Sequence, residues 1–236
     1  ERKLDGIANH DLGALFGAKL KQNGFRINSL NLALAQEVPH NASVVVITQP
    51  RLDLMPGEVD KLLHYVERGG NLLWLIDAEP LHGLERLAEK LDLLLPPGIV
   101  IDPAATKMNA PATWSLGAGY PPQHPITRNF NLITAFPSAR PLAWDEKLMP
   151  SHPNENQSWQ RQVLVEVAAR GWISRNPPDI NASGSEPQFD KQHDIPGPAV
   201  IAVALQRHIN DREQRIVVVG SGAFLSNSFA GNGGNV

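Results

Sequence analysis

The sequence contains no cysteine and no long hydrophobic run, and both absences limit what it can do. Without cysteine there can be no disulfide, no thiolate zinc site, no iron–sulfur cluster and no cysteine nucleophile. No stretch approaches the ~18 to 20 uninterrupted apolar residues that span a bilayer, and the N-terminus lacks the basic-then-apolar pattern of a signal peptide. The printed chain is therefore expected to be soluble.

Clustered positive charge is also missing. The formal net charge is -3 and no run of Lys and Arg occurs, whereas nucleic-acid binders concentrate these residues into a patch. The eight histidines include no pair with the His-x-x-x-His spacing that places two imidazoles on one helical face. We therefore expect no nucleic-acid partner, no metal site and no cofactor.

The composition that is present predicts a folded chain, because 42% of the residues are hydrophobic and only 19% are charged. A length of 236 residues allows one large domain or two small ones. Periodicity and turn residues predict helices over 9–22, 56–68 and 81–93, and strands over 25–32, 43–48, 71–76 and 98–102.

This alternation predicts an α/β core over residues 1–102. Short connections between helices and strands imply right-handed crossovers, so we expect a mainly parallel Rossmann-like or flavodoxin-like sheet with helices on both faces. The run Ser43–Thr48 is β-branched without polar alternation, which is typical of a strand covered on both faces, and it is expected at the centre of the sheet.

The second half of the chain divides into two parts. Residues 103–196 are rich in Pro, Asn and Ser and predict an irregular, loop-rich insertion, with strands only at 132–136, 140–144 and 162–167. Within it, residues 176–194 are expected to form an exposed, mobile loop. Residues 197–236 return to the core sheet through paired strands at 198–205 and 215–219, which makes one composite domain.

The carboxyl ends of the parallel strands are the expected ligand site, because open α/β sheets bind ligands there. The polar residues that this fold would gather are Glu1, Arg2, Gln49, Asp77, Glu79 and Ser221. A structural role is the favoured interpretation: Asp77 and Glu79 would cap the helix that begins near Leu81, and Gln49 would lie in a turn.

Ser221 is the one residue placed like a nucleophile on a strand-to-helix turn. Its surroundings, Gly220-Ser221-Gly222-Ala223, do not match Gly-x-Ser-x-Gly. A glycine-rich turn is therefore favoured over an active serine, and no catalytic residue is assigned.

Several segments, in their order along the chain, resemble the soluble domain of the gliding-motility-type ABC transporter auxiliary family. They are Glu1-Arg2 with Leu4-Asp5-Gly6, Pro50, Glu58, Tyr65, Gly69-Gly70, Asp77, His124-Pro125-Ile126-Thr127, Gly197-Pro198, Arg215–Gly220, Phe224–Asn227 and Gly234-Asn235. The chain departs from the family at Ser221 and Ala223, where Asp is usual. That departure argues against a metal or acid role at the end of the last strand.

The resemblance implies a class I amidotransferase-like α/β fold, an extracytoplasmic (periplasmic) location and membrane anchors outside this chain. It also implies that ABC permease and ATPase subunits are the partners, and that the family's first strand precedes Glu1. We therefore predict a non-catalytic auxiliary domain that binds a partner protein or an exported ligand. The alternatives are a divergent amidohydrolase-like enzyme using Ser221 with a histidine, and a small-molecule sensor using the strand ends.

Overall fold

A five-stranded sheet forms the centre of the molecule in the computed structural model, which describes residues 2–145, 158–175, 187–209 and 212–235. Its strands stand in the order β1-β2-β10-β9-β6. Their bounds are Val45–Ile47 (β1), Leu72–Leu75 (β2), Gln160–Val167 (β6), Ala199–Ile209 (β9) and Arg212–Val219 (β10).

Strand direction changes in the middle of this sheet. β2 pairs in parallel with both β1 and β10, whereas β9 pairs antiparallel with both β10 and β6. β9 and β10 are separated by two residues in the sequence, and a connection of that length can only join antiparallel strands. The sheet is therefore mixed rather than mainly parallel, which corrects the predicted arrangement; the predicted pairing of these two strands is confirmed.

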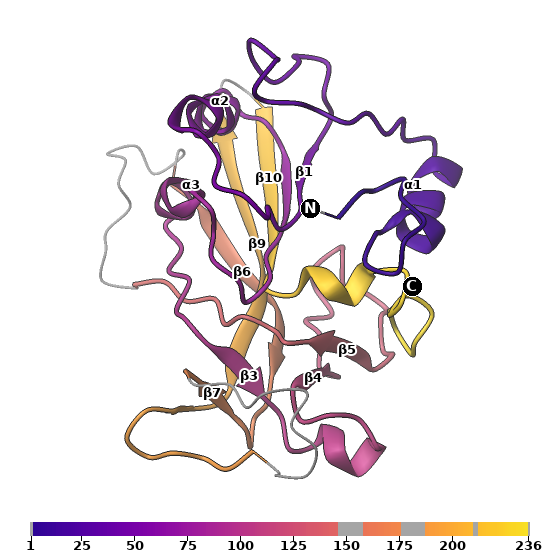
Figure 1. Ribbon diagram of the computed structural model, residues 1–236, viewed down its shortest axis with the longest axis vertical. Coiled ribbons are helices and arrows are strands. Elements are labelled where there is room, and N and C mark those ends of the chain that lie inside the picture. Colours follow the sequence, from indigo (N-terminus) through magenta and orange to yellow (C-terminus); the bar gives the residue numbers. More distant parts are fainter. Residues whose placement is uncertain (1, 146–157, 176–186, 210–211, 236) are drawn as a thin grey trace.

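The described residues form three α-helices. They span Ala18–Gln22 (α1), Pro56–Glu67 (α2) and Glu85–Lys90 (α3), with a π-helical turn at Gly13–Gly17 (η1) and 3-10 turns at Ala105–Met108 (η2) and Gly222–Leu225 (η4). Figure 1 shows α2 and α3 beside one another on the same side of the sheet, away from α1. The predicted layer of helices on each face is not found among the described residues.

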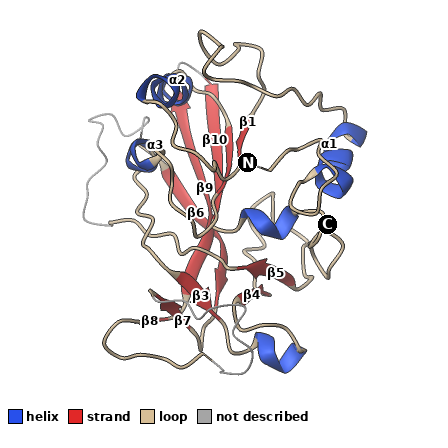
Figure 2. Ribbon diagram, in the orientation of Figure 1, coloured by secondary structure: helices blue, strands red, loops and turns tan. Residues whose placement is uncertain are grey.

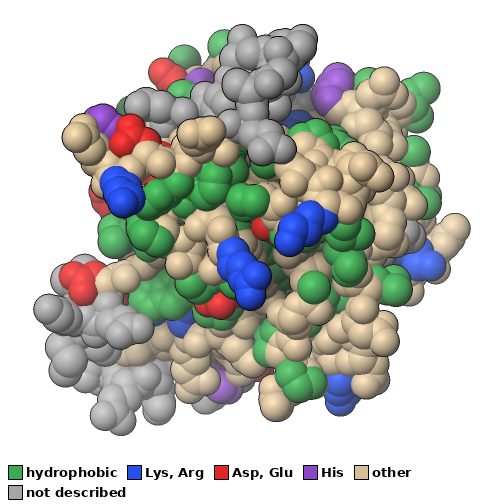
Figure 3. All heavy atoms as spheres, turned by 90° about the horizontal axis from the view of Figure 1, so that it is seen from below, with side chains coloured by type: hydrophobic (Ala, Val, Ile, Leu, Met, Phe, Trp, Pro, Cys, Tyr) green, Lys and Arg blue, Asp and Glu red, His purple; other side chains and the backbone are tan. Residues whose placement is uncertain are grey.

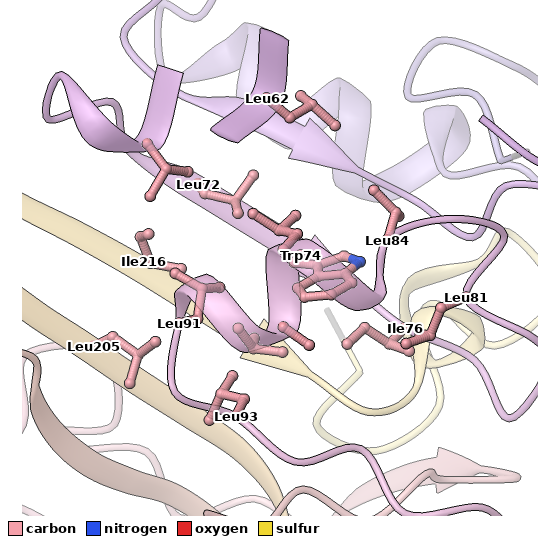
Figure 4. Close-up of a cluster of buried hydrophobic side chains, with 14 of the residues drawn as sticks. Leu62, Leu72, Trp74, Ile76, Leu81, Leu84, Leu91, Leu93, Leu205 and Ile216 are labelled. Carbon is pink, nitrogen blue, oxygen red and sulfur yellow. The ribbon is translucent and has the colours of Figure 1, made fainter. Parts of the chain in front are cut away.

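Alternate side chains of the strands enter two separate hydrophobic clusters. The first lies under α2 and α3 and centres on Trp74, which is 1% exposed (Figure 4). The second lies on the other face, where Leu12, Phe136 and Phe224 cover the sheet instead of long helices. Strand residues of the first cluster include Val45, Ile47, Leu72, Trp74, Val203, Leu205, Ile216 and Val218; those of the second include Val46, Leu73, Leu75, Ala202, Ala204, Val217 and Val219.

Two small antiparallel sheets complete the fold below the central one (Figure 1). One consists of β3 (Ile99–Ile101), β7 (Trp172–Ser174) and β8 (Ile195–Pro196), and the other of β4 (Trp114–Gly117) and β5 (Thr134–Pro137). The strand predicted at 98–102 therefore exists but pairs outside the central sheet.

Other predicted elements differ from the structure. The segment 25–32 is loop rather than strand (Figure 2); Phe25 is 46% exposed, and Leu32 packs against the first hydrophobic cluster. β1 is an edge strand in the described sheet instead of a central one. Residues 140–144 form only an isolated bridge between Ala143 and Leu94. The predicted loop 176–194 lies partly outside the described residues, and the division at 102 and 196 stays a prediction.

The surface agrees with the absence of a basic run in the sequence. On the face that Figure 3 shows, Lys and Arg side chains are scattered among apolar and polar ones rather than gathered into a stripe. Among the described residues, no helix has the length and apolar character needed to cross a bilayer.

Candidate functional site

The parallel strands place three of the predicted site residues at one edge of the sheet. Gln49, Asp77 and Ser221 each stand two residues beyond the end of β1, β2 and β10 respectively. The backbone N–H of Asp77 donates to Oε1 of Gln49 at 3.1 Å, and the N–H of Gly222 donates to Oδ1 of Asp77 at 2.9 Å. The three side chains therefore lie in one cluster, and ligand binding at this edge stays a prediction.

Asp77 is the centre of the cluster. Its Oδ1 accepts hydrogen bonds from the N–H groups of Gly222 and Ala223, at 2.9 and 3.2 Å, at the start of η4. Its Oδ2 lies 2.7 Å from Nη2 of Arg2 in an ion pair whose side chains are 15% and 17% exposed. Both carboxylate oxygens of Asp77 are therefore bonded to other parts of the same chain.

The pKa of Asp77 is raised above its ordinary value. Burial of the carboxylate is the largest cause, and the nearby charge of Glu79 adds to it. The Arg2 guanidinium and the amides of Gly222 and Ala223 act in the opposite direction without cancelling the burial. The carboxylate of Asp77 thus has bonding partners within the protein but little contact with water.

Gln49 is 5% exposed and uses both ends of its amide on the backbone. Oε1 accepts from the N–H of Asp77, and Nε2 donates to the carbonyl of Pro80 at 2.6 Å. The side chain therefore joins the end of β1 to the loop that follows β2. Gln49 was predicted to lie in a turn with Pro50. Its side chain in addition bonds to backbone groups of Asp77 and Pro80.

Ser221 is completely buried, and its hydroxyl donates to the carbonyl of Pro137 at 2.8 Å. No histidine shares a hydrogen bond with it in the described part of the chain; His82, for example, pairs with Asp53 at 2.7 Å. A serine nucleophile needs an exposed oxygen and an adjacent base. Ser221 has neither, so the geometry favours the turn interpretation.

The predicted set also contains Glu1 and Glu79. Glu1 lies outside the described residues. The side chain of Glu79 is exposed, and its charge acts on Asp77. The cap that Asp77 and Glu79 were predicted to form is not found at α3, because the residue preceding this helix is Leu84 and the helix start has no side-chain cap bond.

Arg140 contributes to the same edge, although the sequence did not single it out. It is 8% exposed, its Nη1 donates to the carbonyls of Glu79 at 2.9 Å and Asp77 at 3.4 Å, and burial lowers its pKa. Its own N–H donates to the carbonyl of Gly220 at 2.6 Å. In the sequence, Arg140 is a single charged residue within the mostly apolar segment Phe136–Leu142. That is the signal that could have indicated a buried side chain bonding to backbone carbonyls.

These contacts limit the chemistry available at the strand ends. Among the described residues there is no group of three or more His, Asp or Glu side chains able to hold a metal ion. Gln49, Asp77, Ser221 and Arg140 all bond to backbone groups of neighbouring segments. Among the described residues, these bonds hold the segments that follow the strands in place.

Comparison with known proteins identifies a family and a related fold. A family model described as "ABC-type uncharacterized transport system" matches residues 5–235. A solved structure named "mmIFT52 N-terminal domain" is similar with a TM-score of 0.61 and 14% sequence identity, over 92% of this chain and 83% of that chain. At this identity the likeness shows the fold alone. No curated protein matches the chain.

Proposed function

The chain belongs to the ABC-type uncharacterized transport system family, and we propose that it is a non-catalytic domain that binds a partner protein of an ABC transporter. The family supports an auxiliary role in ABC transport. The observation that supports the non-catalytic part is that the strand-end side chains bond to backbone groups elsewhere in the chain, so that no reactive group is assembled among the described residues.

The partners that fit this role are the permease and ATPase subunits, as in the gliding-motility-type systems that the sequence resembles. The proposal also includes an extracytoplasmic location, membrane anchors outside this chain and a class I amidotransferase-like fold. These finer features rest on the resemblance of short segments, such as Pro50 with Glu58 and Arg215–Gly220, and are part of the proposal.

Co-purification tests the proposal. The natural full-length protein, tagged and extracted in mild detergent after chemical cross-linking, is expected to bring down permease and ATPase subunits of one transporter. A protein recovered without either subunit, while a known membrane complex survives the same extraction, would contradict it.

Surface variants can then locate the contact. Ile7, Leu34 and Leu52 are 91%, 83% and 82% exposed, each on a different loop. Their replacement by Ser changes little apolar burial, so stability should change by less than about 0.5 kcal/mol. Buried apolar side chains dominate binding energy at interfaces, so loss of capture by one variant would mark its loop as the docking face.

The enzyme alternative has its own test. An active Ser221 would be labelled by a serine-directed phosphonate, and labelling would disappear in Ser221→Ala. We expect no labelling of the wild-type protein, because the hydroxyl is buried and bonded to Pro137. Labelling that depends on Ser221 would favour the amidohydrolase-like function instead.

A further inference from the structure

The two ends of the described chain are bound to one another. The N-terminal segment (residues 2–17) and the C-terminal segment (residues 222–235) lie on the same side of the sheet, close to α1 and the end marked C in Figure 1. Asn227 joins them: its Oδ1 accepts from the N–H of Ala14 at 2.8 Å, and its Nδ2 donates to the carbonyls of Ala8 at 2.8 Å and Gly6 at 3.2 Å.

Backbone bonds extend this contact. The N–H of Asn227 donates to the carbonyl of Asp11 at 2.7 Å, and the N–H of Ser228 donates to the carbonyl of Asn9 at 3.1 Å. The bonded residues are more than 200 positions apart in the sequence, so ordering either segment against the other constrains both chain ends at once.

A single carboxylate fastens both segments to the sheet. Asp77, just beyond β2, pairs with Arg2 of the N-terminal segment and accepts from the N–H groups of Gly222 and Ala223 of the C-terminal segment. The backbone of Arg2 is held further by Thr48, whose Oγ1 accepts from its N–H at 3.2 Å and donates to its carbonyl at 3.0 Å.

Apolar contacts place the same two segments in one cluster. Leu12, which is fully buried, and Phe224 and Leu225 pack into the second hydrophobic cluster beside Leu75 of β2. The segments therefore share a carboxylate, a bridging amide and a patch of the sheet. Groups that share partners in this way couple energetically, and contiguous units of this kind can open without global unfolding.

We propose that the N-terminal and C-terminal segments form one cooperative unit, docked on the sheet through Asp77 and released as a whole, so that a change at one chain end reaches the other. Without the Arg2 guanidinium, the carboxylate of Asp77 loses the ion pair that helps to hold it in position for the N–H groups of Gly222 and Ala223. Linkage is reciprocal, so loosening the C-terminal segment must also loosen the N-terminal one. The coupling would operate whichever partner the domain binds.

Hydrogen exchange measured by NMR or mass spectrometry tests this coupling. In Arg2→Ala the amides of Gly222, Ala223 and Asn227, which Arg2 does not touch, should exchange about tenfold faster. Protection of Val203 and Val218 in the central sheet should be unchanged. Arg86→Ala is the matched control, because it breaks the exposed pair with Asp60 and should alter neither segment.

The reverse experiment uses Asn227→Ala. It should accelerate exchange at Lys3 and Leu12, whose amides bond to Asp11 and to the carbonyl of Lys3 rather than to Asn227. Arg2→Lys retains the positive charge and should restore most of the protection lost in Arg2→Ala. Faster exchange confined to the segment that carries the substitution would overturn the proposal, as would equal acceleration throughout the sheet.

Discussion

The two faces of the central sheet are covered in different ways. On one face, α2 and α3 connect successive strands and bury Trp74 and its neighbours through apolar packing. On the other face, segments from both chain ends meet, and polar side chains such as Asp77 and Asn227 fix them by bonds to backbone groups. The first face is built from local connections and the second from contacts across the whole chain.

This difference implies unequal stability. A face held by a helix layer over buried side chains should open only on global unfolding, whereas a face closed by loops and polar bonds should open locally. It also implies that the polar residues at the strand ends are used for closure. The predictions that follow test both statements, beginning with the largest effect.

Trp74→Ala should produce the greatest loss. Trp74 is 1% exposed at the centre of the cluster under α2 and α3, and truncation of such a residue costs about 3–5 kcal/mol. Urea unfolding followed by circular dichroism measures it. Leu52→Ala, at a residue 82% exposed, is the control and should change the free energy of unfolding very little. A cost for Trp74→Ala as small as that of Leu52→Ala would contradict the account.

Leu12→Ala tests the opposite face. Leu12 is fully buried, so we expect a cost of about 2–5 kcal/mol. In contrast to Trp74→Ala, proteolysis should cut the two chain ends before the sheet unfolds, because the end segments lose their main apolar contact. Ile7→Ala, 91% exposed in the same segment, should leave the cutting pattern unchanged. Simultaneous loss of the sheet and the ends would remove the distinction between the faces.

Arg140→Met should cost about 1–3 kcal/mol, because it leaves carbonyls of Glu79 and Asp77 without their buried donor. Met keeps much of the apolar length of the side chain, so the loss reports mainly on the bonds. Thermal unfolding compares this variant with Arg86→Met, whose exposed Arg86–Asp60 pair should contribute less than about 1 kcal/mol. Equal effects at the two arginines would show that the buried clamp stabilises nothing.

Asp77→Asn should alter how stability depends on pH. The pKa of Asp77 is raised mainly by burial, so the folded protein holds this proton at a higher pH than the unfolded chain. The stabilisation from this retained proton is fully present below the ordinary Asp pKa of 3.8 and is lost as the pH rises through the pKa of the folded protein.

Urea unfolding of both proteins from about pH 3 to about pH 7 measures this dependence. Relative to Asp77→Asn, the wild-type protein should lose stability as the pH rises over that window. A wild-type protein that gains stability relative to the variant would mean that Arg2 and the two amides outweigh burial.

Local signals explain which parts of the fold could be predicted. α2 follows from Pro56 at its start, Glu58 in its first turn and Gly69, whose φ of 91° favours glycine, after its end. The side chain of Glu58 does accept from the N–H of Met55 at 2.8 Å. β9 and β10 follow equally from two apolar runs with a polar turn between them.

Features that depend on residues distant in the sequence could not be predicted from local patterns. The apolar residues of 25–32 suggested a strand, but a strand exists only if another strand pairs with it, which the sequence of one segment cannot show. β3 has a strand's sequence, yet its partner β7 lies about 70 residues away and outside the central sheet. The local pattern predicted that β3 is a strand but not which sheet it belongs to.

The candidate site shows the same limit. Fold reasoning places Gln49, Asp77 and Ser221 near one another, because parallel strands end at a common edge. It could not show that these side chains bond to backbone groups, since the partners Pro80, Gly222 and Pro137 come from separate segments: the loop after β2, η4 and β5. Asn227 and Arg140 were missed as closing residues for the same reason.

The most direct test of the account is capture of transporter subunits by the full-length Asp77→Asn protein. If the strand-end residues close the fold and partner binding occurs elsewhere, the folded variant should co-purify with permease and ATPase as the wild-type protein does. Loss of both subunits, with the circular dichroism spectrum and the unfolding midpoint unchanged, would contradict the account and make the strand ends the functional site.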